Sequence, residues 1–201
     1  MNMNEKRIQK PTRIPYALLS LKGRLDARRS KDSVDAYCDK LCLREMAIEA
    51  RAVTAMEHET HFTRETASRQ LAFRQQYLAR LAQPPFSREG EDSATVRLRR
   101  QDAQERLAAQ RGLYTCEQEL ISLHETLTHA RTLLEERMTI CRAQTMEAIR
   151  LYRKDVLPGF PSDPYQGTLG TNSMSAYLAR HEVLDAELEH TVEQLRREEA
   201  A

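Results

Sequence analysis

Residues 33–82 contain neither glycine nor proline, and this stretch of fifty residues restricts the possible folds more than any other feature. Both residue types interrupt helices, so their absence permits a helix of roughly 75 Å at 1.5 Å per residue. Ser30 or Asp32 can cap its N-terminus with a side-chain oxygen. Apolar residues recur along the stretch at seven-residue steps, which predicts one apolar side: Val34, Leu41, Ile48, Ala55 and Phe62.

A second long helix is predicted for residues 93–155, where four leucines follow one another at seven-residue steps, a spacing typical of a coiled coil. The leucines are Leu113, Leu120, Leu127 and Leu134, and the alternate seam positions hold Cys116, Leu123 and Ala130. Beyond the fourth leucine the apolar positions drift by a four-residue step, which predicts a local unwinding of the supercoil. The later positions are Met138, Thr145, Ile149 and Tyr152.

Residues 83–93 predict the turn of a helical hairpin. Pro84 and Pro85 end the first long helix, because proline lacks an N–H and clashes with the preceding turn, and Gly90 permits a reversal. Ser93 can cap the second long helix. If residues 82 and 93 face each other across this turn, the numbers of facing residues sum to about 175 along the antiparallel pair.

Shorter helical segments are predicted at both ends of the chain. Near the N-terminus, a 4-3-4 spacing places four apolar residues on one helix face: Ile14, Leu18, Leu21 and Leu25. Residues 173–201 also have one apolar side, formed by Tyr177, Leu178, Leu184, Leu188, Val192 and Leu195. Nine basic against two acidic residues give residues 1–31 a net charge of +7, and three against seven give residues 172–201 a net charge of −4. Such asymmetry is common at interaction surfaces.

The composition favours an elongated all-α protein. Charged residues make up 30% of the chain and aromatic residues 5%, and there is no tryptophan, so a large compact core is not expected. We expect an elongated, coiled-coil-like antiparallel helical hairpin, with a third long helix folded back on its base and a short basic N-terminal helix. The segments are the basic 1–31, the hairpin 32–155 with its turn at 83–93, the Pro/Gly loop 156–172 and the acidic helix 173–201.

The segment 157–171 is not expected to be helical, because it holds three of the seven prolines and three of the six glycines of the chain. At about fifteen residues it is longer than a reversal between two packed helices requires. Two compatible interpretations remain open. The loop covers the end of the helical bundle, or it presents Phe160 and Tyr165 to a partner as a recognition loop.

Two metal hypotheses were weighed against simpler interpretations. His58, His61 and Glu65 share a helix face, but the two histidines are three residues apart rather than the four of zinc proteases. In the expected register Glu117 lies near His58 and could be a further ligand. The simpler interpretation is that these residues form a solvated helix face. The second hypothesis is a zinc site formed by Cys38, Cys42 and Cys141. In the simpler interpretation these cysteines are small apolar residues of the core.

The simpler interpretation is preferred in both cases, so we expect no metal and no cofactor. The sequence also lacks a Gly-rich phosphate loop and a nucleophile elbow, and we expect a non-enzymatic protein without a small-molecule substrate. No stretch approaches the roughly 18 apolar residues of a membrane span, and the N-terminus lacks the apolar core of a secretory signal. The cysteines do not have the spacing of a disulfide framework. These features predict a cytoplasmic protein without a membrane partner.

Two groups of arginines suggest an alternative function, a nucleic-acid-associated accessory protein. The first group lies in the basic N-terminal segment and the second within the arginine cluster 97–111. Their members are Arg24, Arg28 and Arg29, and Arg97, Arg99 and Arg100. Because no aromatic-rich or groove-reading element accompanies them, any nucleic-acid binding should be weak and independent of base sequence.

The preferred function is that of a structural or adaptor protein that binds a protein partner or itself through coiled-coil helix contacts. If the last helix folds back from residue 173, Leu184 lies near Gln144 and Leu195 near Leu133. The half of the hairpin nearer the turn then has only two helices, too few to bury its wide apolar stripes. The expected partner-binding residues lie in that half: Phe62, Phe73, Tyr77, Leu81, Leu113, Tyr114 and Ile121.

Overall fold

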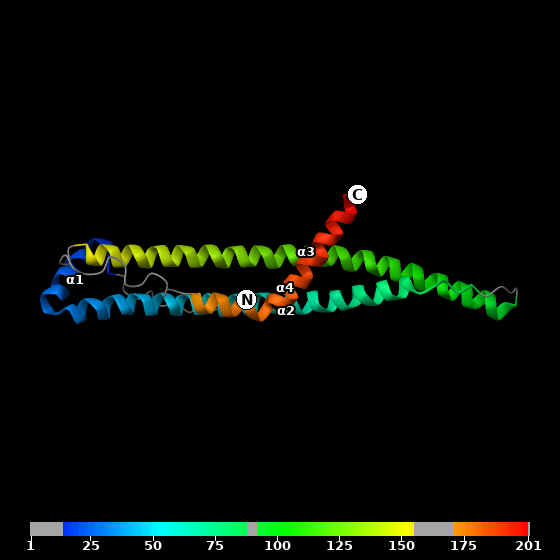
Figure 1. Ribbon diagram of the computed structural model, residues 1–201, viewed down its shortest axis with the longest axis horizontal. Coiled ribbons are helices and arrows are strands. Elements are labelled where there is room, and N and C mark those ends of the chain that lie inside the picture. The colour runs from blue at the N-terminus through cyan, green and yellow to red at the C-terminus, as the bar shows by residue number, and fades with distance from the viewer. Residues whose placement is uncertain (1–13, 88–91, 155–170, 201) are drawn as a thin grey trace, which may run out of the picture. The chain divides into compact units, whose positions relative to one another are not determined.

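The computed structural model describes residues 14–87, 92–154 and 171–200, and all regular secondary structure in these ranges is helical. Four helices follow one another: α1 (Tyr16–Arg29), α2 (Lys31–Ala82), α3 (Ser93–Arg153) and α4 (Thr171–Glu199) (Figure 1). The predicted all-α class is confirmed. Among these described helices, none has both the length and the apolarity to cross a membrane.

Contacts divide the chain into two compact units. Unit 1 comprises Met1–Arg51 with Glu136–Met174, and unit 2 comprises Ala52–Glu135 with Ser175–Ala201. Each unit therefore contains a part of α2 and a part of α3. The segment boundaries expected from the sequence follow helix ends, whereas the contacts divide both long helices in their interiors.

Local side-chain and backbone groups determine where the helices begin and end. The backbone of Ser30 is extended and ends α1, and its Oγ accepts a hydrogen bond of 3.1 Å from the N–H of Ser33 in the first turn of α2. At α3 the capping residue is Asp92 rather than the predicted Ser93, because its Oδ2 accepts a 3.0 Å bond from the Thr95 N–H. A carboxylate is also favoured there by the partial positive charge of the helix N-terminus.

In unit 1, α1 packs on α2 and α3 through a face that differs from the predicted one. Leu19 joins the core of this unit, Gly23 contacts the backbone of Tyr152, and Asp26 is buried. A Cβ atom at residue 23 would collide with the Tyr152 carbonyl, so the glycine permits an approach that no other residue allows. The predicted apolar face is instead exposed: Ile14, Leu18, Leu21 and Leu25.

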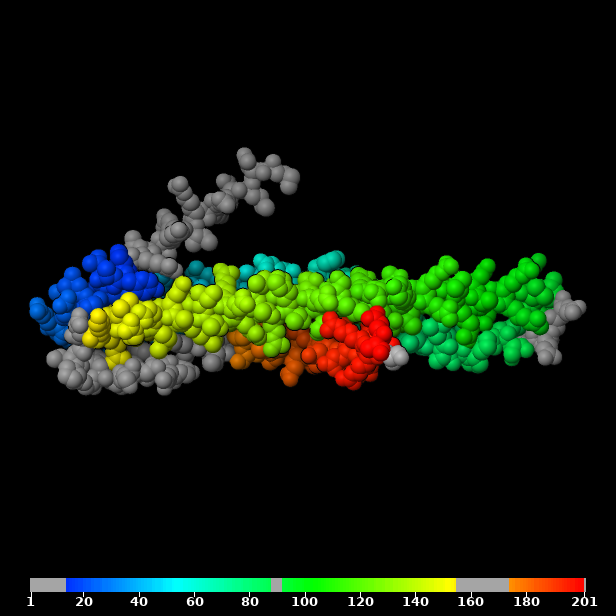
Figure 2. All heavy atoms as spheres, turned by 90° about the horizontal axis from the view of Figure 1, so that it is seen from above, coloured from blue at the N-terminus to red at the C-terminus, as the bar shows by residue number. Residues whose placement is uncertain are grey.

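In unit 2, α4 packs against both α2 and α3, and Figure 2 shows its C-terminal part (red) on α3 (green). The core of this unit draws on all three helices: Ala67, Leu71, Cys116, Leu120, Leu127, Leu188 and Val192. Leu184 packs against this core rather than near Gln144, and Leu195 lies beside Ile121 rather than near Leu133. The position of α4 along α3 thus differs from the expected one.

The register between α2 and α3 also differs from the prediction. In unit 2, Gln70 bonds to Glu119 and Arg74 to Glu117, so the numbers of facing residues sum to 189 and 191 rather than about 175. The cause lies in the residues that follow α2, which continue along α3 instead of turning at once. The N–H of Phe86 donates to Asp102 at 3.2 Å, and the Gln83 carbonyl accepts from Arg106.

The predicted apolar sides of α3 and α4 are largely buried, whereas that of α2 is buried at Val34, half-buried at Leu41 and Ile48, and exposed farther along the helix. On α3, Leu120, Leu127 and Leu134 are buried, and the drift of the stripe reaches Met138, Ile149 and Tyr152 as expected. On α2, Ala55 and Phe62 are exposed. The buried side of α2 contains polar residues that no apolar pattern identifies: Glu45, Glu49, Thr60 and Arg64.

Candidate functional site

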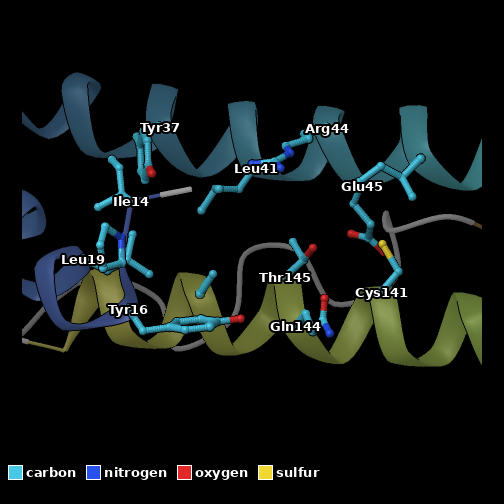
Figure 3. A pocket seen from close by; sticks show the side chains of 13 residues that line it. Ile14, Tyr16, Leu19, Tyr37, Leu41, Arg44, Glu45, Cys141, Gln144 and Thr145 are labelled. Carbon is cyan, nitrogen blue, oxygen red and sulfur yellow. The ribbon is translucent and has the colours of Figure 1, made fainter. Parts of the chain in front are cut away.

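Unit 1 contains a cavity of about 350 Å³ that lies between α2, α3 and the N-terminal end of α1 (Figure 3). Its walls are mainly apolar, with Leu19 from α1, Leu41 and Ile48 from α2, and Ala148 from α3. Figure 3 shows Tyr16, Leu19 and Tyr37 toward one end and Glu45 with Cys141 at the other. The volume lies at the lower end of the range in which proteins hold small molecules.

Glu45 is the unusual group in this cavity. The residue is 1% exposed, and neither carboxylate oxygen has a hydrogen-bond partner among the described residues. A buried carboxylate without donors is costly, since it loses its hydration and gains nothing equivalent in return. An apolar cavity with one unsatisfied carboxylate is therefore the strongest candidate for a ligand site in the described part of the chain.

The charge near Glu45 is only partly balanced. Arg142 Nε lies 2.8 Å from Glu49 Oε1 but 3.9 Å from Glu45 Oε1, so the guanidinium mainly serves Glu49. Two carboxylates thus share one cation. Burial and the neighbouring Glu49 charge raise the pKa of Glu45 to about 7, although Arg142 opposes the shift. Near neutral pH this carboxyl group is divided between its neutral and charged forms.

The burial of Glu45 and Glu49 was not predicted from the sequence. Glu45 lies seven residues after Cys38 and seven before Ala52, and both of these are buried. Glu49 likewise follows the buried Cys42 by seven residues. A charged residue in phase with a buried stripe was the signal available in the sequence.

A polar network holds α1 beside the cavity. Asp26 Oδ2 accepts hydrogen bonds from Lys22 Nζ at 2.5 Å and from the Tyr152 hydroxyl at 2.8 Å. Burial alone would raise the pKa of Asp26, but these two bonds and the positive charges of Lys22 and Arg29 together lower the pKa below its ordinary value. The Tyr37 ring packs on the Tyr152 ring with their centroids 4.5 Å apart, and Lys22 Nζ lies 4.3 Å from the centroid of the Tyr37 ring. Because Tyr16 and Leu19 line the cavity, this network also positions its wall.

The opposite face of α1 is apolar and exposed. Leu18, Leu21 and Leu25 are 47–50% exposed, and we call these three residues the α1 leucine face. They line a surface hollow together with Ile14, Lys22, Arg29 and the buried Asp26, which pairs with Lys22. Arg24, Arg28 and Arg29, predicted to contact nucleic acid, are exposed on the same helix. The face therefore combines apolar side chains with flanking positive charge.

The second arginine group belongs to unit 2. Arg97, Arg99 and Arg100 are exposed in the first two turns of α3. Further along α3, Asp102 lies 3.2 Å from Arg106 of the cluster and 2.7 Å from Arg80 of α2, so it offsets part of the positive charge there. The basic character near the turn is thus confined to a few residues.

The predicted partner-binding residues fall into two groups in unit 2. Phe62, Phe73 and Tyr114 are exposed, at 70%, 44% and 68% respectively. The others are half-buried: Tyr77, Leu81, Leu113 and Ile121. Tyr77 packs against the core and over Gly112, where an added Cβ would lie 2.6 Å from its ring. Leu195 of α4 lies beside Ile121, so α4 occupies part of the surface expected to be free.

The structure does not assemble either of the proposed metal sites. His58 and His61 are exposed, and Glu117 pairs with Arg74 rather than facing His58. Among the described residues, no group of three or more His, Cys, Asp or Glu side chains is arranged to hold a metal. Phe160 and Tyr165, the expected recognition residues of the loop, lie outside the described residues.

None of the four cysteines, all of which lie in the described ranges, forms a disulfide bond. Cys38 and Cys42 belong to the core of unit 1, and burial raises the pKa of the Cys38 thiol to about 11. Cys141 instead lines the cavity with Glu45, because in the observed register its neighbour Arg142 pairs with Glu49, whereas the expected register placed Cys141 opposite Val34. A high thiol pKa suits a packing role rather than a reactive one.

Arg64 is a further buried polar residue that the sequence analysis missed. Its guanidinium donates to Tyr177 Oη at 3.1 Å, to Asp185 at 3.3 Å and to Thr60 Oγ1 at 2.5 Å. Tyr177 and Asp185 belong to α4, so these bonds attach α4 to α2 within unit 2. The role of Arg64 is therefore structural.

Comparison of the chain with family models, with curated proteins and with solved structures found no match. No relative therefore supplies a function for the cavity, for the α1 leucine face or for the exposed residues of unit 2. The residues themselves are the ground for any functional assignment.

Proposed function

We propose that this chain is a non-enzymatic adaptor that binds an acidic amphipathic helix of a partner protein on the α1 leucine face. The observation that carries the proposal is the exposure of Leu18, Leu21 and Leu25 at helical spacing. The exposed Arg28 and Arg29 on the same helix favour glutamate and aspartate on the partner.

The spacing of the three leucines matches the way in which one helix recognises another. Side chains at i, i+3 and i+7 form a stripe that fits the apolar side of a second amphipathic helix. Burying the exposed half of three leucines contributes about 3 kcal/mol before the costs of association. A weak and reversible contact is therefore expected. Free buried cysteines are compatible with a reducing compartment such as the cytoplasm.

The anchoring of α1 makes the proposal testable without unfolding the helix. Leu19, Gly23 and Asp26 attach α1 to unit 1, and none of them belongs to the leucine face. The double variant Leu21→Gln with Leu25→Gln should therefore keep the fold and lose the apolar face. Val183→Gln on α4 is the matched control, because Val183 is 82% exposed and lies in unit 2.

Fluorescence anisotropy with the full chain can measure the contact. The probe is a labelled helical peptide of about 20 residues, with leucines on one side and glutamates on its flanks. A second peptide replaces the glutamates with lysines. We expect the acidic peptide alone to bind, the double variant to bind it at least about tenfold more weakly, and Val183→Gln to bind like the wild type. Equal binding of both peptides, or an unchanged affinity of the double variant, would contradict the proposal.

Two further measurements distinguish the alternatives. DNA titrated against the full chain should bind weakly and lose affinity steeply with salt, whereas binding that persists near roughly 0.5 M salt would favour the nucleic-acid function. Sedimentation of the full chain detects self-association. If Phe73→Glu with Ile121→Glu abolishes self-association and the α1 variant does not, the interface between copies lies in unit 2 and is separate from the α1 leucine face.

A further inference from the structure

We propose that the cavity of unit 1 binds a small organic cation, a primary amine with a short apolar or aromatic body, whose ammonium group pairs with Glu45. This site is independent of the partner contact on α1. The proposal rests on the shape of the cavity, on the unsatisfied carboxylate in it and on the charge balance around that carboxylate.

The carboxylate of Glu45 lacks what an ammonium group supplies. Its two oxygens have no hydrogen-bond donor among the described residues, and a primary ammonium carries three donors. The neighbouring Glu49 has Arg142 at 2.8 Å, while Glu45 has this cation only at 3.9 Å. One negative charge therefore remains when both glutamates are ionised. A bound monocation would neutralise it and satisfy the oxygens, and a charge-assisted hydrogen bond is among the stronger kinds.

The rest of the cavity suits an apolar body rather than a second charge. Leu19, Leu41, Ile48 and Ala148 form aliphatic walls, and Figure 3 shows the tyrosines toward the end away from Glu45. The volume of about 350 Å³ limits the ligand to a small molecule. An amine with a ring two carbon atoms away therefore fits the order of groups along the cavity, with the ammonium at Glu45 and the ring among the apolar side chains.

The other ionisable groups around the cavity leave this assignment intact. Arg44 of α2 also lines the cavity. Its charge lowers the pKa of Tyr37, and it is not among the groups that shift the pKa of Glu45. Arg142 and Cys141 face Glu45 from α3, and Tyr16 faces the cavity from α1. Since the pKa of Glu45 is about 7, the carboxylate that an amine requires becomes more abundant between pH 6 and pH 8. The amine itself stays protonated over this range.

Isothermal titration of the full chain with 2-phenylethylamine tests the proposal. The neutral reference is 2-phenylethanol, which has the same ring and chain length but no charge. At pH 8 we expect the amine to bind at least about tenfold more tightly than the alcohol, and we expect its affinity to rise by several-fold from pH 6 to pH 8. Equal binding of the two compounds, or no binding of the amine at millimolar concentration, would overturn the proposal.

Two variants locate the binding site. Glu45→Gln keeps the size of the side chain and removes its charge, so the preference for the amine over the alcohol should disappear. Glu65→Gln, at an exposed position of α2 in unit 2, should bind the amine like the wild type. Wild-type affinity for the amine in the Glu45 variant would show that the ammonium binds elsewhere. The pH series on the wild type tests the same carboxylate without any substitution, so a variant that fails to fold leaves the proposal open to refutation.

Discussion

Glu45→Gln should stabilise the protein above neutral pH and have little effect in acid. The pKa of Glu45 is about 7 in the folded chain, against an ordinary value of 4.5. A carboxyl group whose pKa is raised by folding stabilises the fold while it is protonated. That contribution is complete below the ordinary pKa and is lost as the pH rises through the folded-state pKa. Between about pH 4.5 and pH 8 the wild type should therefore lose stability at this position, and the glutamine variant should not.

The size of the effect follows from the two pKa values. Each unit corresponds to about 1.4 kcal/mol, so a shift from 4.5 to about 7 corresponds to about 3 kcal/mol in the free energy of unfolding. Glu45 is 1% exposed, so solvent screens this contribution little. Most other carboxylates titrate alike in both proteins and cancel when the variant is compared with the wild type at each pH.

Urea unfolding followed by circular dichroism measures this difference. We expect Glu45→Gln to gain about 3 kcal/mol relative to the wild type between pH 4.5 and pH 8. Glu65→Gln replaces a carboxylate whose side chain is 56% exposed, and it should show no such trend. A difference between Glu45→Gln and the wild type that stays constant with pH would show that the Glu45 carboxyl group is hydrated or fully paired. The structural account of the cavity would then be wrong.

Two further substitutions test how α1 and α4 are attached. Gly23→Ala places a methyl group against the Tyr152 carbonyl, so hydrogen exchange should show loss of protection throughout α1. Leu18→Ala on the exposed face should leave this protection unchanged. Retained protection in the Gly23 variant would contradict the close contact. Arg64→Ala leaves buried partners unsatisfied and should cost about 2 kcal/mol in urea unfolding, whereas loss of the exposed Arg180–Glu57 pair should cost less than about 0.5 kcal/mol. Equal losses for the two arginines would show that Arg64 is solvated.

The apolar sides of α3 and α4 could be predicted because apolar burial depends mainly on spacing along one helix. Leu120, Leu127 and Leu134 repeat every seven residues, and a stripe of leucines is buried by whichever helix lies beside it. The ends of the hairpin could be predicted for a similarly local reason. Ala82 is the last residue of α2, and Pro84 and Pro85 follow it after the single residue Gln83.

The candidate site could not be predicted in the same way, because the burial of a charged side chain depends on partners in other helices. Glu49 is buried beside Arg142, which is distant in sequence and becomes its neighbour only in the correct register. That register depends on residues 83–87, which run along α3 before the chain turns. The expected register assumed that residues 82 and 93 face each other across the turn. Every expected pair, including those of Glu45 and Cys141, is therefore displaced from the observed one.

The position of α1 shows the same limit and has a functional consequence. Apolar spacing alone favours burial of Leu18, Leu21 and Leu25, yet α1 turns this face outward. Its buried face is selected by two features that hydropathy ranks low. Gly23 permits backbone contact with α3, and the carboxylate of Asp26 receives the Tyr152 hydroxyl and the Lys22 ammonium. Because these contacts hold α1 without Leu18, Leu21 and Leu25, the partner helix that we propose for the α1 leucine face would leave α1 attached to α2 and α3.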